Sequence, residues 1–220
     1  MDLDRRDILQ GMMALSAMLA APPLAFAREH TIKHGIHQAK GEVLINGALA
    51  SEGAVAFAGD KIQTGKDGQA VMVIGNVALL IDPETEIDLG EAEERSLSVK
   101  IFTVLTGKML AVFGSGSREI RTPIATIGIR GTAAYIDAQP QRTYACVCYG
   151  VADLQINGAP EASETVATKH HESPRYLYPK GSKTLIEKAP VIDHTDSELI
   201  MLESLVHRVP PFGNKPLEDY

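Results

Sequence analysis

Aromatic side chains are scarce in this sequence. Tryptophan is absent, and aromatic residues make up only 5% of the 220 residues. A hydrophobic core must therefore consist mainly of Val, Ile, Leu, Ala and Met. Hydrophobic residues make up 45% and charged residues 22%, which is ordinary for a globular chain and argues against bulk disorder. The length suffices for one good-sized core and leaves little room for a second full domain.

A basic excess and recognisable catalytic motifs are also missing. The formal net charge is −7, so a mildly acidic surface gives no electrostatic reason to expect nucleic acid or an anionic membrane as partner. The chain has no Gly-x-Ser-x-Gly elbow, no His-Glu-x-x-His motif and no carboxylate pair evidently placed in a cleft. We therefore expect a protein that is not an enzyme.

The N-terminal apolar segment is too short for a membrane anchor, because Pro22-Pro23 interrupts it before the roughly 20 residues that a span requires. It follows the pair Arg5 and Arg6 and ends in a small-x-small pattern at Ala27. These parts predict a signal peptide over residues 1–27, cleaved after Ala27. The arginine pair resembles the twin-arginine motif, so we expect a folded, periplasmic protein with no transmembrane span after cleavage.

Short apolar runs separated by turn residues continue from about residue 41 to residue 188. Gln69–Ile74 and Val77–Ile81 flank Gly75-Asn76, which is a two-residue hairpin signal. No part of this stretch keeps a helical period. Further short strands are expected at residues 108–113, 124–129, 132–136, 143–149, 152–156 and 165–168. The pattern predicts an all-β fold, a sandwich or roll of many short strands.

One amphipathic helix is expected near the C-terminus, at about residues 196–208. Thr195 and Glu198 fit a capping box, and apolar residues then recur at helical spacing. Such a stripe closes one end of a β core or, alternatively, binds a partner. The organisation is then a linker at residues 28–40, a β domain at 41–170 and a C-terminal extension at 171–220.

Several separated motifs resemble the FecR domain, over roughly residues 41–168. They are Gly41-Glu42-Val43, Asn46-Gly47, Gly59-Asp60-Lys61-Ile62-Gln63-Thr64-Gly65, Asp67-Gly68-Gln69-Ala70, Ile120-Arg121-Thr122-Pro123 and Ile129-Arg130-Gly131-Thr132. The resemblance implies an all-β extracytoplasmic module. The regulators that give the family its name carry the signal of occupied iron-siderophore receptors to a cytoplasmic sigma factor.

The chain departs from those regulators at its N-terminus, where only four residues precede Arg5. We therefore expect no contact with a cytoplasmic sigma factor. The expected function is a non-enzymatic binding, sensor or accessory module of the cell envelope, related to iron or another metal. Its partner would be an envelope protein or ligand that the sequence does not identify.

The residues of the FecR motifs are expected to be structural. The first group is suited to tight turns, because its glycines reach positive φ and its Asp or Thr side chains bond nearby amides. In the other group an Arg can cross-link strand ends and a Gly permits a bulge, although the Arg could instead contact a ligand. The first group is Gly59, Asp60, Thr64 and Gly65. The second group is Arg130, Gly131 and Thr132.

The two cysteines, Cys146 and Cys148, are the most specific candidates for chemistry. Residues at i and i+2 of a strand project from the same face, so both thiols should point together. Extended geometry makes a disulfide between them improbable. They are then either small buried apolar residues or metal ligands.

His170 and His171 follow the cysteines on a run that could pair beside their strand. Two thiolates with one or two imidazoles suit zinc or copper. Neighbouring histidines on a strand face opposite sides, so both can bind one ion only if the strand ends there. Tyr144 or His194 could also complete the set. The alternative function is thus a metal-binding or redox-active periplasmic protein.

Export through the twin-arginine route is testable by replacing both arginines, Arg5→Lys with Arg6→Lys. The pair is the recognition element of that route, so the precursor should accumulate in the cytoplasm. Fractionation followed by immunoblotting measures the precursor and the mature form. Unchanged export would instead indicate the general secretory route.

Overall fold

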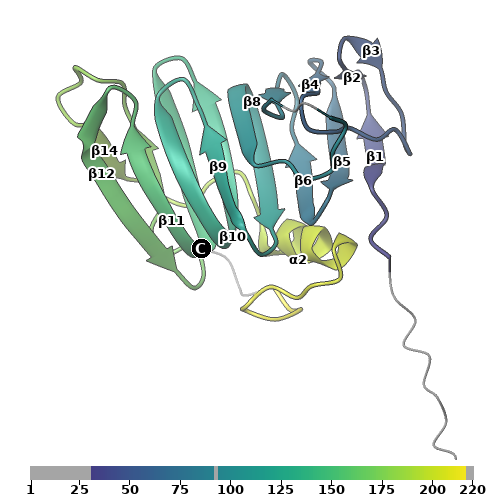
Figure 1. The fold of residues 1–220 in the computed structure, drawn as a ribbon. Coiled ribbons are helices and arrows are strands. Elements are labelled where there is room, and N and C mark those ends of the chain that lie inside the picture. The colour runs from purple at the N-terminus through teal and green to yellow at the C-terminus, as the bar shows by residue number, and fades with distance from the viewer. Residues whose placement is uncertain (1–30, 92–93, 217–220) are drawn as a thin grey trace, which may run out of the picture. The chain divides into compact units, whose positions relative to one another are not determined.

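The computed structural model describes residues 31–91 and 94–216, all but one of them in the unit Ile32–Tyr220. These residues confirm the all-β prediction, with a single helix near the C-terminus (Figure 1). The predicted signal peptide and its cleavage after Ala27 lie outside the described residues. Within the described part, no helix has the length and apolarity needed to cross a membrane.

The elements are β1 (Gly35–Lys40), β2 (Val43–Ile45), β3 (Ala48–Leu49), β4 (Lys61–Thr64), β5 (Gln69–Ile74), β6 (Val77–Ile81), β7 (Glu86–Asp88), β8 (Ile101–Phe113), β9 (Ser117–Arg121), β10 (Ala125–Gln139), β11 (Arg142–Ile156), β12 (Ala159–Thr168), β13 (Arg175–Leu177), β14 (Ile186–Lys188) and α2 (Asp196–Leu205).

The strand pairings define two layers that share the long strands β8, β10 and β11. The first layer joins β12, the C-terminal half of β11, the N-terminal half of β10, β9, the N-terminal half of β8, β7, β4, β2 and β3. The second layer joins β14, β13 and the other halves of β11, β10 and β8 to β6, β5 and β1. The inward-facing side chains of both layers form one large apolar cluster, which is the main core.

Three strands, β8, β10 and β11, are longer than the many short strands that the sequence predicts. The predicted strands at 124–129 and 132–136 are one strand, β10, and those at 143–149 and 152–156 are one strand, β11. The register shifts between Arg130 and Ala134, where β10 leaves the first layer for the second. Because a bulge inserts a residue without ending the strand, it interrupts the sequence pattern just as a turn does.

The predicted linker at 28–40 is wrong for its last six residues. Gly35–Lys40 forms β1, which pairs antiparallel with β5 at the edge of the second layer. Its alternation is weak because only Gly35 and Ile36 are buried, so the period-two pattern has little signal there.

The outer faces of the two layers differ in polarity. On the first layer, outward-facing residues of β10 and β11 such as Thr126, Asp153 and Gln155 are polar and at least partly exposed. On the second layer, most outward-facing residues are apolar and buried. That second cluster includes Val71, Val73, Ala78, Leu80, Leu110, Val112, Ala133, Tyr135, Tyr144, Cys146 and Cys148. A sheet face of this composition needs a cover, since leaving it in water would cost about 25 cal/mol per Å².

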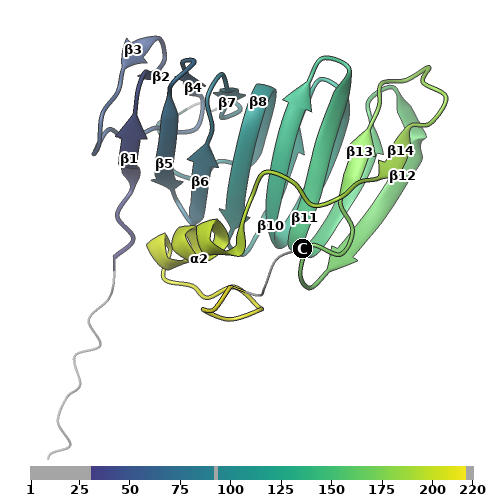
Figure 2. The ribbon, with the colours of Figure 1, turned by 180° about the vertical axis from the view of Figure 1, so that it is seen from behind.

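The C-terminal extension provides the cover. Figure 2 shows the segment after β14 crossing β11 and β10 to reach α2, which lies against β6 and β8. Leu199, Leu202 and Val206 of this segment are buried in the second cluster. The predicted capping box is present at Thr195 and Glu198, and the helix ends at Leu205, slightly earlier than predicted.

The packing where β10 and β11 pass from one layer to the other can be tested at Gly150, and Gly181 is the matched control. Both have φ +94°, but an added Cβ at Gly150 would lie 2.7 Å from Thr132 Cβ, whereas Gly181 has open space. Gly181→Ala should lower the free energy of unfolding by about 1 kcal/mol through backbone strain alone. Gly150→Ala should lose a further ~1–3 kcal/mol through overpacking. Chemical denaturation measures both, and equal losses would contradict the close packing of Thr132 on Gly150.

Candidate metal centre

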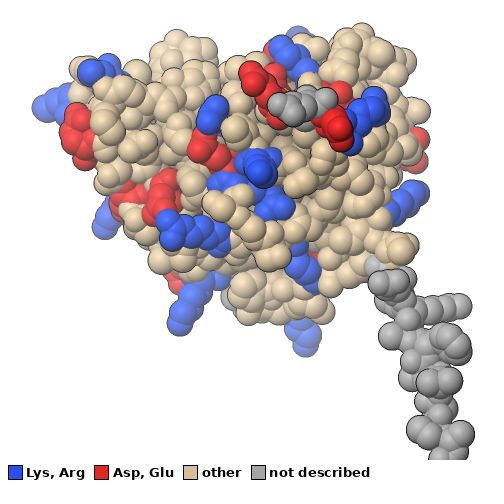
Figure 3. Space-filling view, in the orientation of Figure 1, with Lys and Arg blue, Asp and Glu red and all other residues tan. Residues whose placement is uncertain are grey.

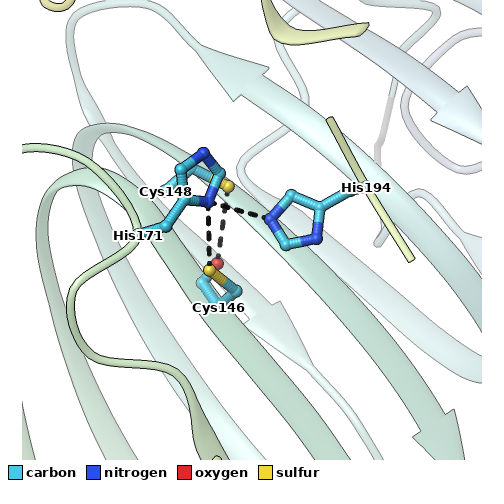
Figure 4. A group of neighbouring side chains, drawn as sticks. All are labelled: Cys146, Cys148, His171 and His194. Atoms are coloured by element: carbon cyan, nitrogen blue, oxygen red, sulfur yellow. Dashed lines mark hydrogen bonds between the residues drawn. The ribbon is translucent and has the colours of Figure 1, made fainter. Parts of the chain in front are cut away.

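Four side chains with metal-binding atoms meet on the outer face of the second layer, beneath the extension. They are Cys146, Cys148, His171 and His194 (Figure 4). The cysteines are 0% exposed, and His171 and His194 are 3% and 6% exposed. The structure therefore brings both cysteines, one of the two predicted histidines and the additional candidate His194 into one dry cluster.

Pairing of β12 with β11 places His171. The pair ends at Gly150 and Thr168, and the Thr168 hydroxyl donates to the Val147 carbonyl over 2.7 Å. Three residues on, the His171 amide donates to the Cys148 carbonyl over 2.9 Å. His171 adopts a φ of +54°, so the chain turns there and the imidazole points at the cysteine strand.

The segment between β14 and α2 places His194. It is attached to the sheet by Tyr144, whose hydroxyl donates to the Pro190 carbonyl over 3.0 Å. The His194 ring stacks on Tyr135 of β10, with centroids 4.6 Å apart and planes 9° from parallel. The helix begins immediately afterwards at the N-cap residue Thr195. Tyr144, the other candidate for completing the site, is thus a support of this segment.

The interatomic distances suit a tetrahedral ion. Cys146 Sγ lies 3.5 Å from His171 Nδ1, and that nitrogen lies 3.0 Å from His194 Nε2. Ligands around zinc at ideal bond lengths would be separated by about 3.6 Å for sulfur to nitrogen and about 3.3 Å for nitrogen to nitrogen. All four ligand atoms lie within 4.8 Å of one another. Small shifts would therefore complete the coordination.

The hydrogen bonds of the two imidazoles determine which nitrogen atoms carry protons. His194 Nδ1 lies 2.6 Å from the Ile192 carbonyl oxygen, which can only accept, so Nδ1 is the donor and Nε2 has the lone pair. His171 Nε2 lies 3.3 Å from a carboxylate oxygen of Asp196, so its Nδ1 has the lone pair. His171 Nδ1 and His194 Nε2 lie 3.0 Å apart, which is the distance of a hydrogen bond or of two ligands of one ion. The contact is stable with one proton between the two nitrogen atoms or with a metal ion bound to both.

The two thiols ionise at different pH because they are adjacent. The Cys148 thiol hydrogen-bonds to Cys146 and holds the pKa of Cys146 well below its usual value. Burial raises the pKa of Cys148 well above its usual value. Two thiolates side by side in this dry site would repel each other. A divalent cation would remove that repulsion and leave the set of two thiolates and two neutral imidazoles uncharged.

Asp196, the first residue of α2, hydrogen-bonds His170 and lies within ion-pair distance of His171. Its carboxylate lies 2.9 Å and 3.0 Å from His170 Nε2 and 3.3 Å from His171 Nε2. A carboxylate behind a ligating imidazole fixes the tautomer and orients the ring. The His170 side chain, which is 19% exposed, thus contacts Asp196 rather than the cysteines. Sequence reasoning did not identify Asp196, although its position in the first turn of a capped helix beside His194 was a usable signal.

The FecR-motif residues lie elsewhere and have structural contacts. Asp60 Oδ2 accepts from the Phe57 amide over 2.8 Å, in a turn that includes Gly59. The Thr64 hydroxyl donates to the Asp82 carbonyl over 2.6 Å, and a Cβ on Gly65 would lie 2.7 Å from Glu42 Oε2.

Arg130, Gly131 and Thr132 lie where β10 changes layers. The Arg130 guanidinium donates to Asp153 on β11 over 2.8 Å, with its side chain 71% exposed. Gly131 has a φ of +58°, and Thr132 is fully buried. The arginine therefore links the neighbouring strands β10 and β11 across the surface rather than two strand ends, and an exposed pair of this kind contributes little to stability.

Residues 60–153 match the family model described as FecR protein. Residues 60–153 are therefore identified as a FecR domain, as the motifs predict. The matched segment includes Cys146 and Cys148, while His171 and His194 follow it. No curated protein matches the chain.

Two crystal structures, at 1.65 Å and 2.50 Å resolution, of a "putative anti-sigma factor" from Parabacteroides distasonis are similar to the chain. Each is 12% identical with a TM-score of 0.48, and the match covers 65% of this chain. The match spans 64% of the length of that protein.

Proposed function

We propose that this chain is an exported, non-enzymatic FecR-domain module of the cell envelope that binds one transition-metal ion through Cys146, Cys148, His171 and His194. The observation that carries the proposal is the convergence of His171 Nδ1 and His194 Nε2, 3.0 Å apart, beside the Cys146 sulfur, which lies 3.5 Å from His171 Nδ1. Cys146 and Cys148 are free thiols and are fully buried, so oxidation to a disulfide does not account for them.

Zinc is the ion that best fits this donor set. Two thiolates and two imidazoles are a known zinc combination, and with Zn²⁺ the site is neutral, which a fully buried position requires. Monovalent copper also binds thiolates and imidazoles, but the site would then keep a net negative charge away from water. Zinc is therefore the proposed cofactor and copper the alternative.

The proposed role is binding or sensing rather than catalysis. A catalytic zinc keeps an open position for water or substrate, whereas four protein ligands fill a tetrahedral ion. The four residues are also buried beneath the extension. A buried ion of this kind stabilises a conformation, and that conformation would be recognised by an envelope protein or ligand.

The proposed location is the periplasm, reached with the metal already bound. The arginine pair at residues 5–6 motivates a route for folded proteins, in which a cytoplasmically loaded ion would survive export. Nucleic acid and a cytoplasmic sigma factor are not proposed partners. The net charge is −7, and Figure 3 shows basic and acidic side chains interspersed over the drawn face.

Metal analysis of the full-length precursor tests the proposal, using the Arg5→Lys/Arg6→Lys chain to keep it in the reducing cytoplasm. Native mass spectrometry with elemental analysis, with and without added ZnSO₄, should find one zinc per chain. Cys146→Ala with Cys148→Ala should remove stoichiometric zinc. His171→Asn should as well, because Asn tolerates the positive φ at that position but cannot replace the imidazole.

Two further variants calibrate that result. His37→Gln changes a histidine of β1 outside the cluster and should retain the full equivalent of zinc. Asp196→Asn removes the charge behind His171 and should weaken zinc binding by about 10–100-fold in a chelator competition. The proposal would be rejected if the parent chain binds no stoichiometric metal, or if the double cysteine variant retains one equivalent.

A further inference from the structure

The four proposed ligands come from three separate segments of the chain. Cys146 and Cys148 belong to β11 within the FecR domain, His171 follows β12, and His194 immediately precedes α2. An ion bound by all four would therefore cross-link the FecR sheet to the start of the helix. Resting on the proposed metal site, we infer that metal occupancy controls whether α2 stays attached to the sheet.

The N-terminal end of α2 is attached by this cluster, by Asp196, which hydrogen-bonds His170, and by the buried Leu199. Lys108 pairs with Asp193 over 2.6 Å, but both side chains are substantially exposed, at 35% and 49%. Exposed pairs of this kind contribute about 0–1 kcal/mol. His194 also stacks on Tyr135, and the proposed ion would hold that ring in place. The ion would add metal–ligand bonds to these contacts, so its removal should loosen this end.

A separate polar network anchors the C-terminal end of α2. The Tyr149 hydroxyl of β11 donates to Glu203, and Arg208 Nε donates to the other Glu203 oxygen over 2.6 Å. Arg208 Nη1 also donates to the Asn76 carbonyl in the β5–β6 turn over 3.1 Å. These groups lie outside the metal-binding cluster. The two ends of the helix are therefore attached by different chemistry.

Detachment at the N-terminal end would unfold the helix rather than merely move it. The helix has 10 residues, and isolated helices shorter than ~12–15 residues are marginal in water. Its buried residues Leu199 and Leu202 would leave the outer face of the second layer, and the apolar cluster there would become exposed. Loss of the ion would thereby expose an apolar surface on the FecR domain.

Hydrogen exchange with mass spectrometry on the full-length precursor tests this inference, comparing the zinc-loaded protein with the same protein treated with a chelator. Removal of zinc should raise exchange of residues 194–202 by roughly tenfold or more, because opening there no longer breaks metal bonds. The paired strands β5 and β10 should change little. Equal exchange of residues 194–202 in the two states would overturn the inference.

The test separates this inference from the proposed function. A chain that binds zinc but shows unchanged exchange retains its metal site and loses only the control of α2. A chain that binds no zinc fails at the earlier step. Because chelation is carried out on the unmodified ligand set, the comparison does not depend on a variant that might misfold.

Glu203→Gln is the matched variant for the opposite end of the helix. It weakens the network of Tyr149 and Arg208 without touching a proposed ligand. With zinc bound, faster exchange should be confined to residues 203–208, and without zinc it should extend over the whole helix. Release of the whole helix in the zinc-loaded variant would show that Glu203, and not the ion, holds α2.

Discussion

The contact between the second layer and the C-terminal extension is the constraint on which the rest of the molecule depends. The outer face of that layer carries Val, Leu, Ala and Tyr side chains that are buried only because residues 189–206 lie across them. The first layer needs no such cover, because its outer face is polar. This asymmetry explains why a segment beyond the matched FecR residues is part of the folded unit.

The same contact creates the metal-binding cluster. The sheet contributes two thiols that already face outward from β11, and the covering segment brings His194 onto them. Exclusion of water then makes any uncompensated charge costly and makes a neutral zinc complex favourable. The Ile192 carbonyl holds a proton on His194 Nδ1, and the Asp196 carboxylate favours a proton on His171 Nε2, so that the other two nitrogen atoms point to one place. The covering of the apolar face, the charge balance of the proposed zinc complex and the orientation of its ligands therefore all depend on this one region.

The sequence predicted the parts of this molecule that local periodicity encodes. Alternation identified the strands, the capping box identified α2, and the spacing of Cys146 and Cys148 correctly placed both thiols on one face. It divided β10 and β11 in two because the glycine-containing bulges at Gly131 and Gly150 interrupt the pattern as turns do. It grouped His170 with His171 because a positive φ at His171, which separates their directions, has no sequence signature in a histidine. Pairing of His194 with the cysteines depends on how the extension crosses the sheet, which is non-local information.

X-ray absorption spectroscopy at the metal edge of the loaded, full-length protein tests the central claim most directly, because it reports the ligand atoms themselves. Zinc held by Cys146, Cys148, His171 and His194 should show two sulfur neighbours at about 2.3 Å and two nitrogen neighbours at about 2.0–2.1 Å. A first shell of oxygen and nitrogen atoms alone would contradict the account, since the ion would then lie outside the cysteine face.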